Sequence, residues 1–474
     1  MQENETNSGK RLSWPIIAGF IVVVALILIG LFLPPISLGT RLGLGGGQEV
    51  TGVTPEATSA VSTGLPEGVS LPTRAGAAVG VSRVAAADLA TAAGGALAEA
   101  AAALPAESVV GDAYVLDFSG DAPSGQIALP LPAGLTGVED IDLRGWDGAA
   151  WNHVPGQIDA AAGQAVVSEG MLPRALVFVH TAPPAQPVIS AEYAPDATVP
   201  DEVASLLSEV SVGGLTLGPD GNLSGEVTTE AAEGMDRYLR VTNRGAVTDQ
   251  AAITTFLNDT AMQDAQISSL VDQAKAGGYA GVHVDYQGIP GPMSAAFTAL
   301  VTRLADALHA EGLQLAITLG TPAPIGNGWD TGGQNWAALG RAADIVHIQM
   351  PLDPAAYVEN GPAEQLVAWT VGQIDRSKVN LLLTAGAINK VGDVYTELPS
   401  EQALANLGRL AVAGGAAEVD PGATVDVTLE GTASPLEWDG SALAYKYTFG
   451  QAGQEQTVWF VSEAALVNRL KLVS

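Results

Sequence analysis

The sequence contains no cysteine, which excludes disulfides, thiolate metal sites and a cysteine nucleophile. Basic residues are scarce as well: 20 Lys and Arg stand against 51 Asp and Glu, for a formal net charge of −31. This balance argues against nucleic acid as a partner and favours a solvated acidic surface that keeps the protein soluble. Only 5 histidines are present, without HxH or HExxH spacing, and no Gly-rich phosphate loop follows the early strands. We therefore predict neither a metal site nor a cofactor.

One long apolar run lies near the N-terminus, from Trp14 to Leu33, and it carries no charge. At roughly 20 residues it is long enough to span a bilayer. Lys10 and Arg11 precede it, which predicts that the N-terminus stays in the cytoplasm. A cleaved signal peptide is the alternative, but its apolar region would be shorter and a small-residue cleavage site would follow, where this chain has two prolines. We expect a cytoplasmic tail over 1–13, a single-pass transmembrane helix over 14–34, and the bulk of the chain outside the cell membrane.

Residues 35–72 are rich in Gly, Thr, Ser and Pro, which predicts a flexible linker. From 73 to 196 short apolar runs alternate with turns, and this indicates a β-sandwich accessory domain. A hairpin is expected at the Asp-Gly turn between Trp146 and Trp151. The two tryptophans could stack on sugar rings, but closing the core of a sandwich is the commoner use of such residues.

Predicted strands and helices alternate over residues 197–474, the pattern of a parallel α/β sheet or barrel. Besides the central stretch described next, the strands are predicted over 236–243, 313–319, 344–350 and 379–384. We expect an α/β fold of the TIM-type (β/α)₈-like barrel class. The chain stops within what would be the last helix, so we expect the barrel to be incomplete at its C-terminus.

The central stretch of this domain is a strand in which three apolar residues, from Val282 to Tyr286, alternate with His283, Asp285 and Gln287. Polar side chains on the inner face of a parallel barrel need partners or a function. A His facing an Asp inside a barrel is often a satisfied pair. A carboxylate at the C-terminal end of a strand, by contrast, lies on the face of a barrel that carries active sites. Asp285 is therefore the stronger functional candidate of the two.

This strand resembles the signature of glycoside hydrolase family 18, the chitinase and spore cortex-lytic group, whose strand-four motif reads Asp-Gly-x-Asp-x-Asp-x-Glu. The corresponding residues here, 280–287, read Ala-Gly-Val-His-Val-Asp-Tyr-Gln. The segment 336–350 is similar to the one that leads to the family's Met-x-Tyr-Asp strand, and 435–439 and 458–460 are similar to its late hairpin. The resemblance covers about 205–474 and is carried by this collinear order, because no single motif is intact.

In that family the last Glu of the motif protonates the glycosidic oxygen, and the Asp two positions earlier orients the N-acetyl group of the substrate, which attacks the anomeric carbon. The resemblance puts Asp285 in the orienting position and Gln287 in the acid position. A carboxamide has no titratable proton near neutral pH, so Gln287 cannot act as the general acid, and the loss should cost roughly 10²–10⁴ in rate. At the second motif Met350 and Asp353 match the family, and Leu352 replaces its Tyr.

We therefore predict a degenerate catalytic site of Asp285, Gln287 and Asp353. The residues expected to contact substrate are Asn243, His283, Tyr286, Trp329, Trp336 and Met350. Trp329 and Trp336 would offer an aromatic sugar platform, although packing serves equally for Trp336, which lies on a predicted helix.

Three functions are compatible with these residues. The first is a membrane-anchored barrel that binds cell-wall or chitin-like glycan containing N-acetylglucosamine without efficient hydrolysis. The second is an active glycosidase on peptidoglycan or chitin-like glycan that uses another acid, with Asp285, Asp353 or Asp330 as candidates. The third is a structural or protein-binding surface module, in which Asp285 and His283 only satisfy each other.

Overall fold

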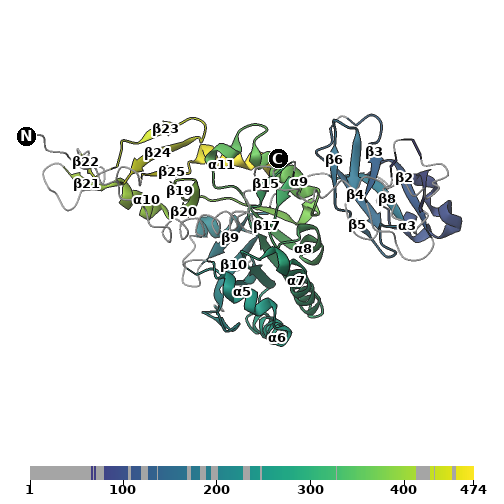
Figure 1. Ribbon diagram of the computed structural model, residues 1–474, viewed down its shortest axis with the longest axis horizontal. Coiled ribbons are helices and arrows are strands. Elements are labelled where there is room, and N and C mark those ends of the chain that lie inside the picture. The colour runs from purple at the N-terminus through teal and green to yellow at the C-terminus, as the bar shows by residue number, and fades with distance from the viewer. Residues whose placement is uncertain are drawn as a thin grey trace, which may run out of the picture. The chain divides into compact units, whose positions relative to one another are not determined.

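The computed structural model describes most of the chain from residue 66 to residue 473 (Figure 1). The described residues are 66–67, 69–70, 79–104, 108–118, 126–135, 137–167, 172–181, 188–193, 201–227, 235–245, 248–326, 328–412, 427–431, 433–450 and 455–473. They all belong to one of the two compact units into which the chain divides, the unit of Ser62–Leu71 and Ala78–Ser474. The predicted tail and transmembrane helix lie outside the described residues, as does most of the predicted linker. No helix within the described ranges is long and apolar enough to cross a membrane.

Two antiparallel sheets form the N-terminal part of this unit (Figure 1). The five strands of the first are, in spatial order, β1 (Val79–Ala85), β2 (Val109–Phe118), β8 (Ala175–His180), β4 (Ile141–Trp146) and β5 (Trp151–His153). The three strands of the second are β3 (Ile127–Pro130), β7 (Gln164–Val167) and β6 (Gly156–Asp159). Leu116 and Phe178 of the first sheet belong to the same buried cluster as Ile127 and Val167 of the second. The two sheets therefore share one hydrophobic core.

The predicted hairpin between Trp146 and Trp151 is confirmed. The two tryptophans are direct partners of β4 and β5, with ring centroids 5.7 Å apart. Asp147 Oδ1 accepts hydrogen bonds from two backbone N–H groups of the turn, and Gly148 takes the positive φ of +112° that this turn needs. Trp146 is buried. The Trp151 Nε1–H donates to the backbone carbonyl of Ala100 in α3 (Ala98–Ala102), a helix that follows the 3-10 helix η1 (Ala86–Gly95). Both rings thus close a core.

A third, mostly parallel sheet forms the larger part of the unit. Its strands are β9 (Ser190–Tyr193), β10 (Glu209–Leu217), β11 (Leu223–Ser224), β12 (Asp236–Thr242), β13 (Gly281–Asp285), β14 (Gln314–Leu319), β17 (Ile345–Gln349) and β18 (Val379–Leu382). From β10 the order runs through β12, β13, β14 and β17 to β18, and every strand but β11 is parallel to its neighbours. The five strands predicted over 236–384 are confirmed.

The sequence placed residues 188–191 in the sandwich domain, which we expected to end at 196. In the structure β9 instead pairs in parallel with β10 of the large sheet. The sequence of a short apolar strand does not indicate which strand it pairs with, because the pairing is set by side chains far away in the sequence. The parallel part therefore begins at β9, before residue 197.

The parallel sheet is curled, since side chains of strands that are not neighbours meet on its inner face. His283 of β13 contacts Ser211 of β10 across β12. Asn380 of β18 donates to Glu209 of β10 over 2.8 Å, with four strands between them in the sheet order. In the part of the chain that the structure describes, β18 and β9 do not pair with each other, so the described sheet is curled and open. The complete eight-stranded barrel stays a prediction.

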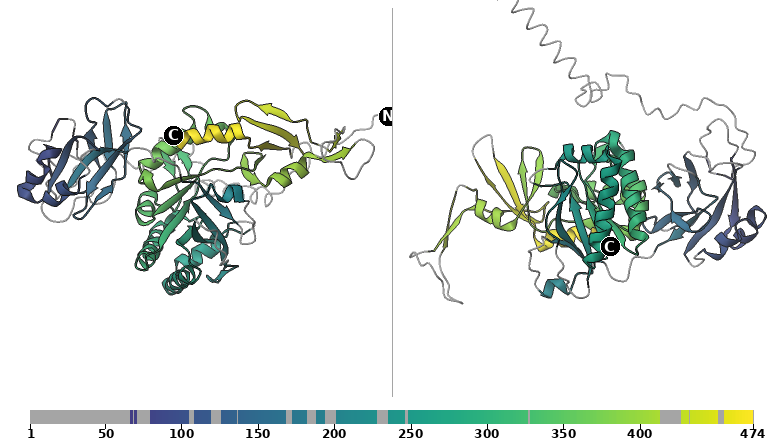
Figure 2. Two further views of the ribbon diagram at one scale, coloured as in Figure 1. Left: turned by 180° about the vertical axis from the view of Figure 1, so that it is seen from behind. Right: turned by 90° about the horizontal axis from the view of Figure 1, so that it is seen from below.

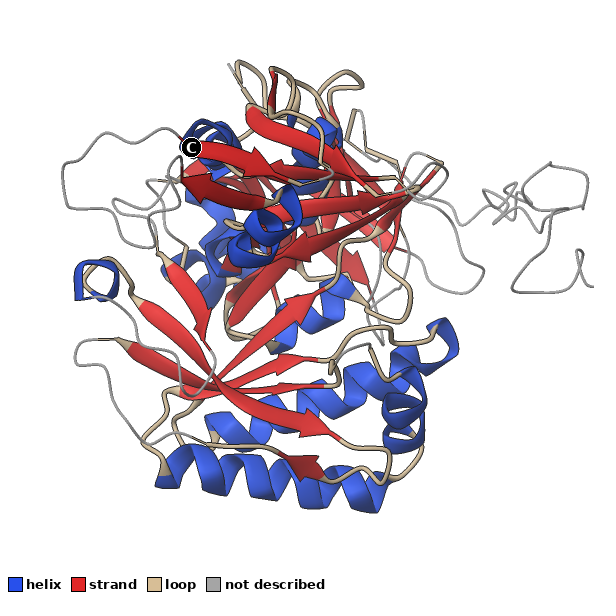
Figure 3. Cartoon of the chain, turned by 90° about the vertical axis from the view of Figure 1, so that its left-hand side faces the viewer, coloured by secondary structure: helices blue, strands red, loops and turns tan. Residues whose placement is uncertain are grey.

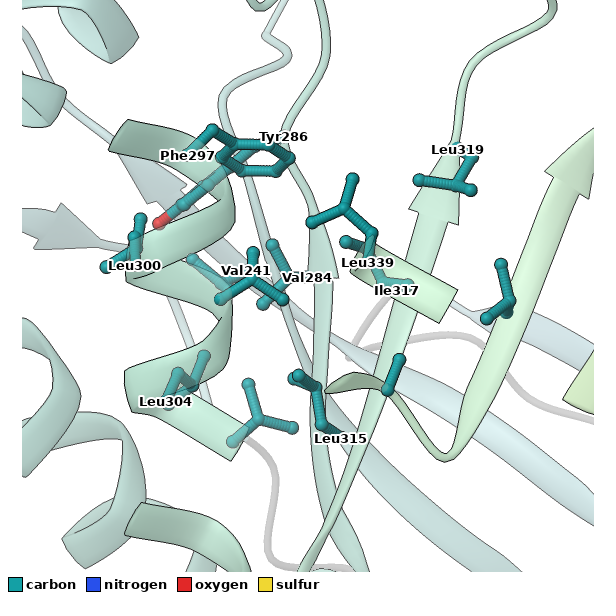
Figure 4. Packing of buried hydrophobic residues seen from close by; sticks show 14 of the residues in the cluster. Val241, Val284, Tyr286, Phe297, Leu300, Leu304, Leu315, Ile317, Leu319 and Leu339 are labelled. Atoms are coloured by element: carbon teal, nitrogen blue, oxygen red, sulfur yellow. The ribbon is translucent and has the colours of Figure 1, made fainter. Parts of the chain in front are cut away.

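Helices cover the outer face of this sheet (Figures 2 and 3). They are α5 (Gln250–Leu257), α6 (Thr260–Ala276), α7 (Ser294–His309), α8 (Trp336–Ala342) and α9 (Pro362–Val371). The short helix α4 (Asp201–Ala204) precedes β10, and the 3-10 turns are η2 (Gly291–Met293), η3 (Pro354–Tyr357) and η4 (Arg376–Lys378). Asp249 and Asp259 cap α5 and α6, each accepting from a backbone N–H of the first turn. Phe297 and Leu304 of α7 point at the sheet and pack with Val284 (Figure 4). Burying each such side chain contributes about 1.5–3 kcal/mol to folding.

A fourth sheet follows β18 and is antiparallel. Its strands are, in order, β20 (Val394–Leu398), β19 (Ala387–Val391), β25 (Gln456–Phe460), β24 (Ala444–Phe449) and β23 (Glu437–Asp439). The remaining elements are the hairpins β15 (Ala323–Ile325)–β16 (Gly328–Asp330) and β21 (Arg409–Val412)–β22 (Val427–Glu430), the helices α10 (Ser400–Leu407) and α11 (Glu463–Leu470), and the 3-10 turn η5 (Lys471–Val473). Tyr447 and Val458 pack on Ala403 of α10, so this helix covers one face of the fourth sheet.

Candidate functional site

Asp285 ends β13 and is fully buried on the inner face of the parallel sheet. Its Oδ2 atom forms ion pairs with two guanidinium groups, that of Arg240 on β12 and that of Arg244, 2.7 Å away in the segment after β12. The register pairs Thr242 with Asp285, and the Thr242 hydroxyl donates to the Asp285 carbonyl over 3.0 Å. A buried carboxylate needs such partners, because its transfer out of water is costly.

Gln287 follows Asp285 by two residues and is held from two sides. Its Nε2 donates to Asp285 Oδ1 over 2.9 Å and to the backbone carbonyl of Thr318, on β14, over 3.0 Å. The buried Asn243 side chain holds the Gln287 backbone: its Oδ1 accepts from the N–H and its Nδ2 donates to the carbonyl, each over 2.8 Å. Both carboxylate oxygens of Asp285 are therefore occupied, one by arginines and the other by the Gln287 amide.

His283 lies on the same inner face, with no exposed surface. Its Nδ1 is 2.7 Å from Ser211 Oγ, its Nε2 is 2.7 Å from Thr318 Oγ1, and its ring stacks on that of His347 of β17, with centroids 4.8 Å apart. Burial, aided by the neighbouring His347, lowers the pKa of His283 well below its usual value, and burial lowers the pKa of His347 to about 4. Both rings are therefore neutral at pH 7. His283 and Asp285 satisfy their polar atoms with other residues, and the pair expected between them is not formed.

A second carboxyl group, that of Glu192 on β9, joins the ion-pair cluster. Glu192 Oε2 is 3.3 Å from the Arg240 guanidinium, so Arg240 bridges Glu192 and Asp285. Burial raises the pKa of Glu192, against the opposing effect of Arg240. Glu192 Oε1 and Arg240 Nε are buried and have no hydrogen-bond partner among the described residues. These residues form a polar cluster near the carboxyl ends of the strands, the edge at which parallel sheets carry their sites.

Sequence reasoning missed Arg240, Arg244 and Glu192. The alternation in the strand predicted over 236–243 puts Arg240 on one face with Thr242, but it does not say that β13 is the neighbouring strand. The sequence therefore indicated which face of the strand Arg240 lies on, but not that Asp285 is its partner. In the part of the chain that the structure describes, no group of three His, Asp or Glu side chains is arranged to hold a metal ion.

The predicted residues of the second motif lie after β17. Met350 is buried, and its N–H donates to the carbonyl of Leu382 on β18 over 3.3 Å. Asp353 caps η3, with its Oδ1 accepting from the N–H of Ala355 over 2.9 Å. Asp330, the other candidate acid, accepts in the same way from the N–H of Gly332. Both carboxylates thus stabilise local turns.

The predicted aromatic contacts are spread over different environments. Tyr286 lies on the outer face of the sheet beside Phe297, and its hydroxyl donates to Gln266 of α6 over 2.9 Å (Figure 4). Trp336 is only 2% exposed and packs on Trp369, with ring centroids 5.1 Å apart. Trp329 is half-buried on β16 and packs against the same outer core. The structure thus gathers Asp285, Gln287, Asn243 and His283, and it places Tyr286 and Trp336 away from them.

Comparison with known proteins gives similarity at the level of solved structures. No family model and no curated protein matches the chain. The spore cortex-lytic enzyme SleL of Bacillus megaterium is 15% identical with a TM-score of 0.42, over 65% of this chain and 72% of that one. A chitinase of Chromobacterium violaceum is 18% identical with a TM-score of 0.43, over 60% and 92%. A class V chitinase of Pseudomonas fluorescens is 20% identical with a TM-score of 0.40, over 56% and 86%.

Proposed function

We propose that the chain is a glycoside hydrolase family 18-like protein that binds glycan containing N-acetylglucosamine, of the cell-wall or chitin-like kind, and does not hydrolyse it efficiently. The residues of the strand motif, and their collinear order with the later motifs, support the resemblance. The proposed binding region is the mouth of the curled sheet, at the carboxyl ends of β9, β12, β13 and β17. We further propose that residues 14–34 anchor the chain in the cell membrane with this region outside.

One observation carries the non-hydrolytic part. The side chain at the acid position is an amide, and its Nε2 is committed to Asp285 Oδ1 and to the Thr318 carbonyl. Such a group has no proton to give to a leaving oxygen near neutral pH. The orienting carboxylate is committed as well, because Arg240 and Arg244 hold its other oxygen. The candidate acids Asp353 and Asp330 cap turns and lack hydrogen bonds to Asp285 or Gln287 among the described contacts.

A pull-down on peptidoglycan and on chito-oligosaccharide beads, run beside a hydrolysis assay with the full chain in detergent, tests the proposal. We expect binding without hydrolysis. Gln287→Glu restores a titratable group at the acid position and should bring measurable hydrolysis. Gln334→Glu, at another buried glutamine whose Oε1 accepts from the Gly320 N–H, is the matched control and should stay inactive. Hydrolysis by the unmodified chain would overturn the non-hydrolytic assignment.

A second candidate is a structural or protein-binding module. It is favoured by one observation: Asp285 has no exposed surface and all of its side-chain oxygens have protein partners. Such a carboxylate serves the fold as a counter-ion for two arginines. Failure of the unmodified chain to bind any glycan in the pull-down would select this candidate over the first.

A further inference from the structure

Trp459 of β25 is a partly buried tryptophan whose ring is held by a carboxylate. Its Nε1–H donates to Asp439 Oδ2 over 3.1 Å, and the Lys446 ammonium lies 3.3 Å from the same oxygen. Asp439 Oδ1 accepts from the Ser441 hydroxyl over 2.6 Å and from the backbone N–H groups of Ser441 and Ala442. Asp439 and Trp459 belong to the two halves of the late hairpin that the sequence singled out, and this contact joins them. A buried or partly buried indole N–H usually has a partner, and this one fixes the direction of the ring.

Two further side chains extend this ring across the sheet. The ring of Tyr395, on β20, is tilted by 34° from that of Trp459, with centroids 6.3 Å apart. The Lys390 ammonium lies 4.9 Å from the centre of the Tyr395 ring. The register pairs Trp459 with Ile388 and Lys390 with Tyr395, so all of them share one face, opposite to the face covered by α10. We call Trp459, Tyr395 and Lys390 the aromatic strip.

The sheet that carries the aromatic strip follows the carboxyl end of the parallel strands, because β19 begins at Ala387, shortly after β18 ends at Leu382. Glu397, on the same face of β20, interacts electrostatically with Glu192, which is itself bound to the Arg240 bridge. Lys390 interacts electrostatically with Asp353, which caps η3 after β17. Charged residues on the face of the aromatic strip are thus within electrostatic reach of Glu192 on β9 and of Asp353.

We propose that Trp459 and Tyr395 form a sugar-stacking surface at this mouth, with Lys390 beside it, that takes a pyranose ring of the glycan. The inference rests on the proposed function and names the residues that would carry it. The apolar face of a pyranose can be buried against an aromatic ring, and a ring fixed before binding loses little side-chain freedom on contact. Trp336, which the sequence predicted as part of an aromatic sugar platform, is buried, whereas Trp459 and Tyr395 keep some exposed surface.

The test is the affinity of chitotetraose for the full chain, measured by titration calorimetry, with Trp459→Ala, Tyr395→Ala and Trp438→Ala. Trp438 is 49% exposed on the opposite face of the same sheet, so its truncation is a matched control. We expect the dissociation constant to rise about tenfold for Trp459→Ala and Tyr395→Ala and less than twofold for Trp438→Ala. Asp439→Asn keeps the ring but weakens its anchor, and should raise the dissociation constant about threefold.

Trp459→Phe retains an aromatic ring and controls for unfolding of the sheet that carries Trp459. It should recover most of the affinity, with an unchanged circular dichroism spectrum. If the unmodified chain binds chitotetraose and both Trp459→Ala and Tyr395→Ala bind it equally well, the aromatic strip is not the contact surface, and the inference alone fails. If the unmodified chain binds no glycan, the proposed function fails and this inference fails with it.

Discussion

The Gln287 side chain, two residues beyond the end of β13, donates a hydrogen bond over 2.9 Å to the carboxylate of Asp285, the last residue of that strand. The glutamine at the acid position thus satisfies one oxygen of the Asp285 carboxylate. The amide supplies a donor to one carboxylate oxygen where a second carboxylate would repel it, and Arg240 and Arg244 take the other oxygen. Asp285 is therefore a buried carboxylate with both of its oxygens paired.

Introducing a carboxyl group at this position should make stability depend on pH. In Gln287→Glu the new group faces Asp285 Oδ1 and the Thr318 carbonyl, both acceptors, so its folded pKa is raised above the unfolded value. Its stabilising, protonated form is then present at low pH and lost as pH rises. We expect urea unfolding to show a loss of about 1–3 kcal/mol at pH 8 and a smaller one at pH 5. Gln402→Glu, at an exposed glutamine of α10, should change little at either pH.

Removing the buried carboxylate should be far more damaging than removing an exposed one. Asp285→Ala leaves Arg240, Arg244 and the Gln287 amide without their partner in a buried site. We expect a loss of about 3–5 kcal/mol in the free energy of unfolding. Asp264→Ala breaks an ion pair with Arg303 in which the Asp264 side chain is 63% exposed, and it should cost less than about 1 kcal/mol. Equal urea midpoints for the two variants would contradict the role given to the cluster.

The stacked histidines should make the protein less stable in mild acid. Burial lowers the pKa of His347 from 6.5 to about 4, so between these values the unfolded chain binds a proton that the folded chain does not. Stability is therefore constant for this group above pH 6.5 and falls as pH drops toward 4, by up to about 3 kcal/mol. His347→Gln should flatten this part of the stability–pH curve. His180→Gln, at a half-exposed histidine, should leave the slope unchanged.

The outward direction of Tyr286 predicts that it takes no part in ligand binding. Tyr286→Phe removes only the hydrogen bond to Gln266, on the helix side of the sheet. We expect a loss of about 0.5–1.5 kcal/mol in stability and an unchanged dissociation constant for chito-oligosaccharide. A clear loss of affinity in calorimetry, with the thermal transition intact, would return Tyr286 to the binding site.

Asn243 should act through the backbone of Gln287. Asn243→Asp keeps the oxygen that accepts from the Gln287 N–H but removes the donor to the Gln287 carbonyl. A buried carbonyl without a donor costs about 1–3 kcal/mol, so the variant should unfold at lower urea. Asn258→Asp, at the exposed end of α5, is the matched control and should stay within about 0.5 kcal/mol.

The sequence by itself determined the local features. Alternation of apolar and polar residues predicted β13 and its polar inner face, because this period is set within a few residues. It also determined that position 287 cannot supply a proton, since that follows from the covalent chemistry of an amide.

Only the tertiary structure decided what each polar side chain meets. Arg240 reaches Asp285 across 45 positions of sequence, and the short strand β9, predicted for another sheet, brings Glu192 to Arg240. Trp459 meets Asp439 across 20 positions, which turns two separate sequence matches into one anchored ring. These pairings depend on which strands become neighbours and how far the sheet curls, and the free energy that selects them is summed over the whole core rather than written in any one segment.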